Sequence, residues 1–163
     1  MPEAICNTSP LLYLYRLRVL DWLSQIFSGV WTPQAVALEI QDGQVKGYDV
    51  PTLNDYAWLQ IVEPRSLTSE WLALDLGAGE LATLSLALEN PSRIIVLDDA
   101  FARRTAQAAG LKVWGTLKVL LEAKSQGLTR QLAPLISQLE DAGMWISHDI
   151  RQRILMLANE VKE

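Results

Sequence analysis

Oxygen-bearing side chains stand at the ends of short apolar segments in this sequence, and together they could bind a metal ion. The set comprises Asn7, Glu39, Glu80, Asp98 and Asp99. A cluster of carboxylates repels itself unless cations neutralise the charge, and hard divalent cations such as Mg²⁺ or Mn²⁺ prefer oxygen ligands. If these side chains converge, they predict a metal site that can cleave a phosphodiester bond.

Each of these residues also has a purely structural explanation. Glu80 would favour the positive end of a helix, and Asp98 or Asp99 could be a helix N-cap. Glu39 could be solvated, and Asn7 could begin a turn. The predicted chemistry therefore depends on the elements that bring these residues together.

Those elements alternate between short strands and helices. We expect strands at residues 4–6, 29–31, 59–62, 93–97, 112–114 and 145–146, and helices at 11–15, 19–27, 34–40, 79–90, 100–109, 117–124, 130–142 and 147–161. Ser9, Thr32 and Thr116 are the expected N-caps, and residues 41–52 read as a loop. The alternation predicts a single α/β domain over residues 1–163, with a largely parallel sheet whose ligands bind beyond the carboxyl ends of the strands.

Motifs for other kinds of chemistry are absent from the sequence or weak. The single histidine, His148, is best explained as a surface residue at a helix start, and Cys6 as a small buried residue of a strand. Residues 77–79 lack the Gly-Lys-Ser/Thr ending of a phosphate loop, and no cysteine–histidine spacing suits zinc. The acidic set remains the main candidate.

Composition narrows the class of protein. The 163 residues are 50% hydrophobic and include one cysteine, which is enough for a core without disulfides and favours a reducing compartment. A formal net charge of −5 argues against passive nucleic-acid binding, although not against an enzyme that holds phosphate through cations. With no basic leader and no apolar run of roughly 20 residues, we expect a cytoplasmic protein without a membrane span.

Five segments, taken in order, resemble a known family. They are residues 7–11 (NTSPL), 32–40 (TPQAVALEI), 76–80 (LGAGE), 97–103 (LDDAFAR) and 115–117 (GTL). They resemble the PIN-like domains, and most closely a prokaryotic branch of unknown function that is similar to the toxin ribonucleases of toxin–antitoxin pairs. The resemblance covers residues 4–157. It implies a three-layer α/β/α sandwich with a mostly parallel central sheet, and hydrolysis of RNA that depends on Mg²⁺ or Mn²⁺.

The resemblance also implies roles for individual residues. Glu39, Glu80 and Asp99 match the catalytic, metal-binding acids of the family, with Asp98 as a neighbouring candidate. Asn7 falls where most PIN domains place an aspartate. Its amide oxygen can coordinate a cation, but because it carries no full charge the site would bind metal more weakly.

Four further residues could contact the substrate. Thr8 or Ser9 falls where the family uses a hydroxyl to orient the first acid, and Arg103 and Arg104 could contact phosphate or could be solvated charges of a helix. In the mechanism that we expect, one or two cations orient and deprotonate a water molecule, stabilise charge on the phosphate and assist the leaving oxygen.

Two alternatives stay open at this point. One is a weak or inactive PIN-like module that binds RNA or protein, which Asn7 favours, and the other is a phosphatase or DNA nuclease that uses the same acids. The resemblance also implies a homodimer and a small antitoxin as partners. Tryptophan is enriched at interfaces, and this chain has six: Trp22, Trp31, Trp58, Trp71, Trp114 and Trp145.

Overall fold

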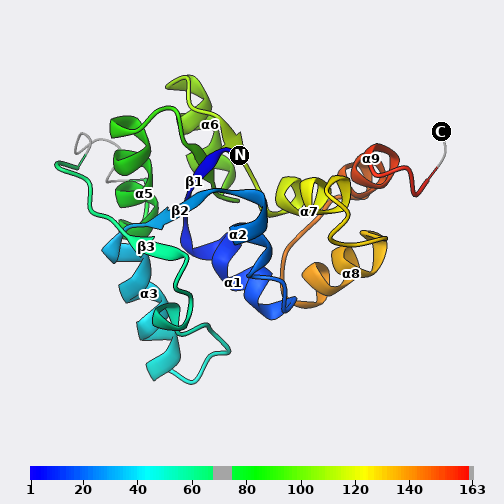
Figure 1. The fold of residues 1–163 in the computed structure, drawn as a ribbon, viewed down its shortest axis with the longest axis horizontal. Helices are drawn as coiled ribbons and strands as arrows, with labels where there is room; N and C mark the ends of the chain where they lie inside the picture. The colour runs from blue at the N-terminus through cyan, green and yellow to red at the C-terminus, as the bar shows by residue number, and fades with distance from the viewer. Residues whose placement is uncertain (68–74, 162–163) are drawn as a thin grey trace.

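A parallel sheet with the strand order β3-β2-β1-β4-β5 lies at the centre of the computed structural model (Figure 1). The structure describes residues 1–67 and 75–161, so Trp71 lies outside the described residues. The strands are β1 (Glu3–Cys6), β2 (Gly29–Thr32), β3 (Leu59–Ile61), β4 (Ile94–Val96) and β5 (Val113–Trp114). The prediction of these five strands is confirmed. The predicted strand at residues 145–146 is wrong, because these residues form an irregular segment between two helices.

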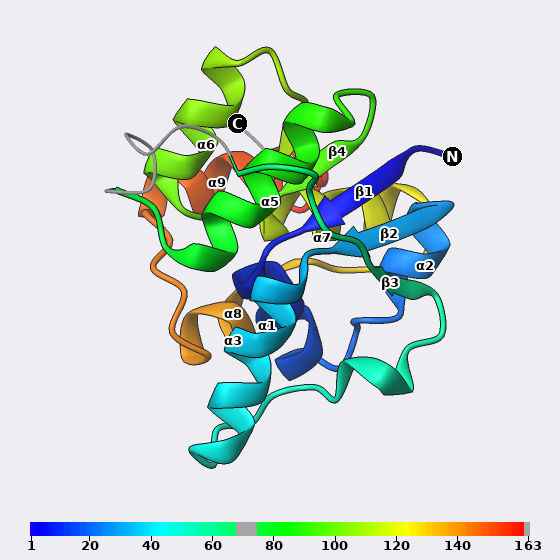
Figure 2. The same cartoon turned by 90° about the vertical axis from the view of Figure 1, so that its left-hand side faces the viewer.

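Helices cover both faces of this sheet, which confirms the predicted three-layer α/β/α sandwich. The helices are α1 (Thr8–Arg16), α2 (Trp22–Ile26), α3 (Gln34–Val45), α5 (Ala78–Glu89), α6 (Ala100–Ala108), α7 (Thr116–Ser125), α8 (Ala133–Asp141) and α9 (His148–Leu157), and a 3₁₀ turn covers Leu53–Asp55. Figure 2 shows α5 on the near side of β1 and β4, with α7 behind them. None of the described helices is long and apolar enough to cross a membrane.

Alternation along the strands divides the core between the two faces. In β1, Ala4 and Cys6 belong to the cluster that includes α1, α2, α7 and α8, whereas Ile5 belongs to the cluster that includes α5 and α6. In β4, Ile94 and Val96 face the first cluster and Ile95 faces the second. Both strands are buried on both faces, and this explains their continuous apolar sequence.

The strand order reverses between β1 and β4. The chain runs outward from β1 through β2 to β3, and it then returns to the other side of β1 to form β4 and β5. Open parallel sheets bind their ligands at the carboxyl ends of the strands where the order reverses. Asn7 follows β1 and Asp98 follows β4 at this position, and the Asn7 N–H donates to the Val96 carbonyl at 3.0 Å.

The first helix starts two residues earlier than its proline signal suggests. Asn7, and not Ser9, is the N-cap of α1, because the helix begins directly where β1 ends. At its other end, Arg18 has a φ of 62° and closes α1, and the helix predicted at residues 19–27 is shorter, covering only Trp22–Ile26. Left-handed backbone at a residue other than glycine is uncommon and ends regular structure here.

The helix after β2 also differs from the expectation. Pro33 is the N-cap of α3, and the Thr32 hydroxyl donates to the Cys6 carbonyl at 2.8 Å instead of capping the helix. This bond ties the end of β2 to the end of β1. The helix continues to Val45, so the loop predicted from residue 41 begins later.

A glutamate near the C-terminus joins the last two helices. Glu160 accepts hydrogen bonds from the backbone N–H groups of Leu132 (2.7 Å) and Ala133 (3.0 Å), and from Lys124 Nζ at 2.9 Å. A carboxylate at these positions satisfies free N–H groups at the start of a helix. It therefore explains why α8 begins at Ala133 rather than at residue 130 as predicted.

Candidate active site at the carboxyl edge of the sheet

Asn7 is buried at the point where β1 passes into α1, with 4% of its surface exposed. Its Oδ1 lies 3.4 Å from the Thr83 hydroxyl, but that hydroxyl lies closer to the Gly79 carbonyl, at 2.7 Å. A hydroxyl has one proton, so the amide oxygen of Asn7 receives only a long, shared hydrogen bond. The sequence analysis did not identify Thr83; a hydroxyl side chain within a mostly apolar helix was its one signal.

Glu39 lies at the start of α5, although it belongs to α3. Its Oε1 accepts from the Gly79 backbone N–H at 2.8 Å, and its Oε2 accepts from the Thr8 hydroxyl at 2.6 Å. Free N–H groups in the first turn of a helix favour an anion at this position. Of the two predicted hydroxyls, Thr8 is therefore the one that orients an acid, and that acid is Glu39 rather than the residue after β1. Ser9 is a half-buried residue of α1.

Close approach of Glu39 to α5 requires glycine at position 79. A Cβ atom added to Gly79 would lie 2.6 Å from both carboxylate oxygens of Glu39, so the Glu39 side chain could keep its present position only beside a glycine and would otherwise have to move. The second glycine of the predicted turn, Gly77, has open space at the same place. The two glycines therefore have different roles, which their spacing in the sequence does not reveal.

Glu80 is the residue on which the negative charges of the set converge. Burial raises the pKa of the Glu80 carboxyl, the nearby charges of Asp99 and Glu39 raise it further, and a hydrogen bond from the Gly77 backbone opposes them. That bond is the half of a capping box in which a glutamate in the first turn reaches back to the N-cap. The structural and the chemical explanations of Glu80 therefore both apply.

Asp98 and Asp99 are neighbours in the chain but have different partners. Asp99 caps α6 by accepting from the Ala102 N–H at 2.8 Å. Asp98 accepts from the Thr116 N–H at 2.8 Å and from the Thr116 hydroxyl at 2.7 Å. The N-cap of α7 is Gly115, so the expected capping role of Thr116 is wrong and its hydroxyl holds Asp98 instead.

Burial changes the pKa values of Asp98 and Cys6, which lie at the carboxyl ends of β4 and β1. Burial raises the pKa of Asp98, although hydrogen bonds from Thr116 and the charge of Arg103 oppose the rise. Burial, with a smaller effect of Asp98, raises the pKa of the Cys6 thiol to about 12. Cys6 therefore stays protonated at neutral pH, which excludes it as a nucleophile and confirms the prediction of a buried strand cysteine.

The two arginines after the acidic pair have different environments. Arg103 is half-buried, and its Nη1 donates to the Leu97 carbonyl at 3.1 Å. Arg104 is exposed. A role for either in holding phosphate stays a prediction.

The predicted ligands are chemically suited to a divalent cation. They would bind it through few carboxylates and would not surround it with protein ligands. Among residues 1–67 and 75–161, no group of three His, Cys, Asp or Glu side chains is placed to hold one ion. Mg²⁺, however, keeps several waters and is commonly bound through one or two carboxylates. The donors are all oxygens. Burial raises the pKa of Glu80 first, and the negative charges of Asp99 and Glu39, which a cation would offset, raise it further.

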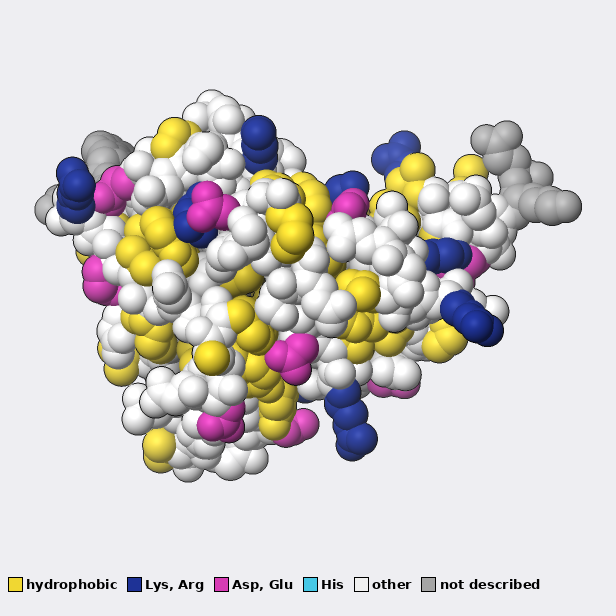
Figure 3. Space-filling view, in the orientation of Figure 1, with side chains coloured by type: hydrophobic (Ala, Val, Ile, Leu, Met, Phe, Trp, Pro, Cys, Tyr) yellow, Lys and Arg dark blue, Asp and Glu magenta, His cyan; other side chains and the backbone are white. Residues whose placement is uncertain are grey.

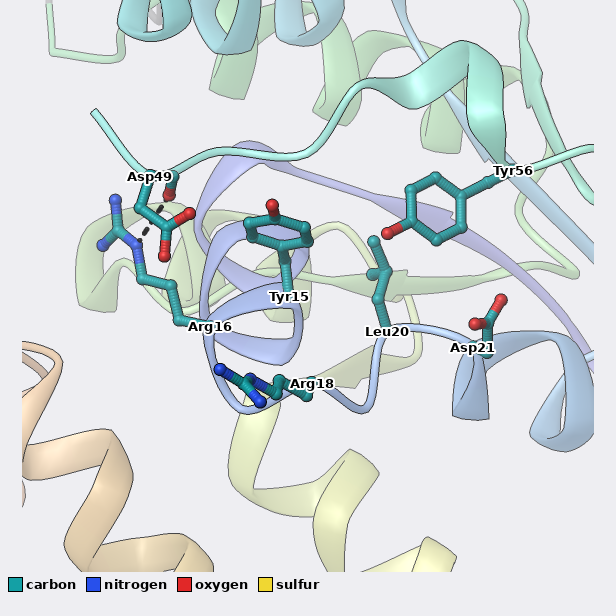
Figure 4. Close-up of a pocket in the computed structure, with 7 residues that line it drawn as sticks. All are labelled: Tyr15, Arg16, Arg18, Leu20, Asp21, Asp49 and Tyr56. Carbon is teal, nitrogen blue, oxygen red and sulfur yellow. Dashed lines mark hydrogen bonds between the residues drawn. The ribbon is translucent and has the colours of Figure 1, made fainter. Parts of the chain in front are cut away.

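A separate surface pocket lies away from the predicted acids. A pocket of about 360 Å³ opens at the far end of α1, with Tyr15, Tyr56, Arg16 and Asp49 in its wall (Figure 4). Arg16 Nε donates there to the Asp49 carbonyl at 3.1 Å. None of the predicted acids lines this pocket.

Comparison with known proteins identifies the family. The profile of a PIN domain family, DUF3368, matches residues 3–160. The chain belongs to the PIN domain family. PIN domains are generally nucleases, and they generally use divalent metal ions. The resemblance drawn from the five sequence segments is therefore confirmed.

A solved structure supports the fold of this PIN domain independently. A PilT N-terminus domain protein from the hyperthermophilic archaeon Sulfolobus solfataricus P2 is similar, with a TM-score of 0.53 and 11% sequence identity. The similarity covers 74% of this chain and 92% of that one. No curated protein matches the sequence. At this identity the similarity concerns the fold, so the roles of residues rest on the geometry above.

Replacing Gly79 by alanine tests the contact between the Glu39 carboxylate and the start of α5. We expect Gly79→Ala to lower the free energy of unfolding by about 0.5–1.5 kcal/mol, because the new methyl group displaces the Glu39 carboxylate from its hydrogen bonds with Gly79 and Thr8. The measurement is urea unfolding followed by circular dichroism. Gly77→Ser is the matched control, since its side chain meets open space and serine is a favoured N-cap. Equal stability of the two variants would contradict this account.

The raised pKa of the Asp98 carboxyl predicts that the free energy of unfolding depends on pH. This dependence is to be measured with EDTA present. Since its pKa is raised in the folded protein, its ionisation disfavours folding. Relative to Asp98→Asn, the wild type should be most stable below the usual aspartate pKa of about 3.9, and it should lose this advantage as pH rises through the raised pKa. Asp98→Ala leaves the Thr116 N–H without a partner and should cost about 1–3 kcal/mol. A difference between wild type and Asp98→Asn that is constant with pH would refute the assignment.

Proposed function

We propose that this PIN domain is a divalent-metal-dependent ribonuclease that hydrolyses RNA phosphodiester bonds. One observation carries the proposal: where the strand order reverses, Asp99 and Glu39 lie near enough to Glu80 for their charges to raise its pKa, and Asn7 contacts the same helix through Thr83. A protein gains no stability from placing carboxylates together, and their repulsion is compensated when a cation binds between them.

The contacts suggest how the residues divide the work. Glu80, Asp99 and the amide oxygen of Asn7 would hold the ion, and Glu39 would keep its charge beside it through the bonds from Thr8 and Gly79. The bound cation would lower the pKa of a water molecule and stabilise charge on the phosphate. Asp99 has one oxygen committed to the Ala102 N–H, so this bond would orient the carboxylate.

The choice of RNA as substrate, and of a toxin with an antitoxin partner as the biological setting, follows from the family resemblance. The geometry supports phosphodiester hydrolysis in general. RNA and DNA oligonucleotides of the same sequence, together with p-nitrophenyl phosphate, are therefore the substrates to compare. Equal cleavage of DNA, or hydrolysis of the small ester alone, would favour the DNA nuclease or the phosphatase.

Cleavage of a fluorescently labelled RNA in Mg²⁺ or Mn²⁺ tests the proposal. We expect Glu80→Gln and Asp99→Asn each to lower the rate by at least about 10- to 100-fold, because each removes a charge that holds the ion. Asparagine is also a good N-cap, so Asp99→Asn should preserve α6. Asp42→Asn, on the exposed end of α3 beside Lys46, is the matched control and should cleave like the wild type. If all four proteins cleave equally, or none cleaves, the proposal fails.

A second candidate is a PIN domain without catalysis that binds RNA or protein. The neutral Asn7 favours it, because the site holds one charge fewer than an aspartate would supply. The same RNA assay with Asn7→Asp separates the two. A ribonuclease should cleave as the wild type and faster as Asn7→Asp, whose metal binding is stronger. Activity that appears only in Asn7→Asp would establish the second candidate for the natural chain.

A further inference from the structure

A groove connects the acidic edge of the sheet with the C-terminal helices. It has a volume of about 330 Å³, and its wall includes Asp98, Arg103, Trp145, Ile146 and Ile150. Asp98 belongs to the acidic set, so a molecule that lies in this groove would contact one residue of that set.

Trp145 is the most unusual residue of the groove. It is 84% exposed, and Ile150 beside it is 47% exposed. A large aromatic side chain that stays in water, next to other apolar side chains, marks a binding surface more often than chance exposure. Packing against the core does not explain a tryptophan at this position, because Trp145 belongs to neither core cluster.

The segment that carries Trp145 is held firmly at both sides. Arg151 of α9 pairs with Glu140 of α8, and Glu160 binds the start of α8. The indole is thus presented from a braced connection between two helices. Because the backbone at this position is held, less conformational entropy is lost there when a ligand stacks on the indole.

Positive charge is concentrated in the C-terminal part of the chain, where it could attract a polyanion. Residues 1–99 contain five Lys and Arg against thirteen Asp and Glu, whereas residues 100–163 contain nine against six. On the face shown in Figure 3, Lys and Arg side chains project around the end of the molecule formed by α7, α8 and α9. Arg103 in the wall of the groove, together with the Lys and Arg side chains at this end of the molecule, suits the phosphates of a polyanion.

We propose that this groove binds an unpaired base of a single-stranded RNA, stacked on the Trp145 indole. The proposal rests on the proposed ribonuclease function and adds a subsite for substrate recognition. Bases of single strands stack on exposed aromatic side chains with little sequence preference, while the backbone follows basic groups. Because bases in a duplex are already stacked and paired, the subsite selects single strands.

Continuity with the acidic edge favours a nucleotide over a protein in this groove. Arg103 and Asp98 extend the apolar surface into polar surroundings, as a base linked to a phosphate requires. A stable protein contact would need about 1,000 Å² or more of buried surface, far beyond one indole and its neighbours. A second copy of the chain on this surface is the competing outcome of the test.

The experiment measures binding without cleavage. Fluorescence anisotropy in EDTA compares a labelled single-stranded oligouridylate with an abasic oligomer of the same length, which has the same phosphates and no bases. Trp145→Ala should bind the oligouridylate about 5- to 150-fold more weakly, and Trp145→Phe, which keeps an aromatic ring, should bind close to wild type. Affinity for the abasic oligomer should be equal in all three proteins. Tyr48→Ala removes an aromatic side chain that is 63% exposed on a distant loop, and it should change neither affinity.

Each other result overturns the subsite. Unchanged oligouridylate affinity in Trp145→Ala, or an equal loss for the abasic oligomer, would show that no base stacks there. A wild-type dimer in sedimentation velocity that dissociates in Trp145→Ala, with RNA affinity unchanged, would assign the groove to a second copy. Since this assay uses EDTA, its failure leaves the metal-dependent cleavage assay to decide the ribonuclease proposal separately.

Discussion

The carboxylate of Glu39 on the first turn of α5 is the contact on which the candidate site depends. It joins a helix that follows β2 to the helix that precedes β4 through the backbone N–H of Gly79, where the missing side chain leaves room for the carboxylate. Once α5 is placed in this way, Glu80 must face Glu39 and Asp99. The same bond that organises the helices therefore gathers the negative charge.

The two ends of the sheet are stabilised by opposite means. At the amino ends of the strands, Arg93 is buried, donates to the Ala4 carbonyl at 3.1 Å, lies over the Trp31 ring and pairs with Glu3. One cation there joins three strands. At the carboxyl ends, carboxylates accept backbone and hydroxyl hydrogen bonds, which hold them in place without neutralising them. The charge left at that edge is the property that a bound cation would use.

Asn7 changes this balance in a definite direction. It occupies the most buried position of the set, where an ionised aspartate without a metal would be costly. A neutral amide lowers that cost and also lowers the attraction for a cation. In the proposed function, this exchange would favour the metal-free state at the expense of affinity for the ion, and the C-terminal groove would supply substrate contacts that do not depend on metal.

The sequence by itself determined the layered architecture and most members of the site. Strands buried on both faces must be continuous apolar runs, and helices beside them must begin where the runs end, so both features are local and visible. Asp99 as a helix cap and Glu80 at a helix start are local in the same sense. Their roles could be read without knowing what lies across the sheet.

Tertiary structure alone decided which partners the polar groups have. Thr8 binds Glu39 across 31 positions, Thr116 binds Asp98 across 18, and a distant carboxylate rests on the backbone of Gly79. The N-caps predicted at Thr32 and Thr116 were wrong because these hydroxyl groups bind distant acceptors in the folded chain, and local preference is too weak to prevent it. Ser9 is not an N-cap because α1 already begins at Thr8. The exposure of Trp145 also could not be predicted from the sequence. An apolar residue is expected to be buried, and only the folded structure shows that this one is exposed.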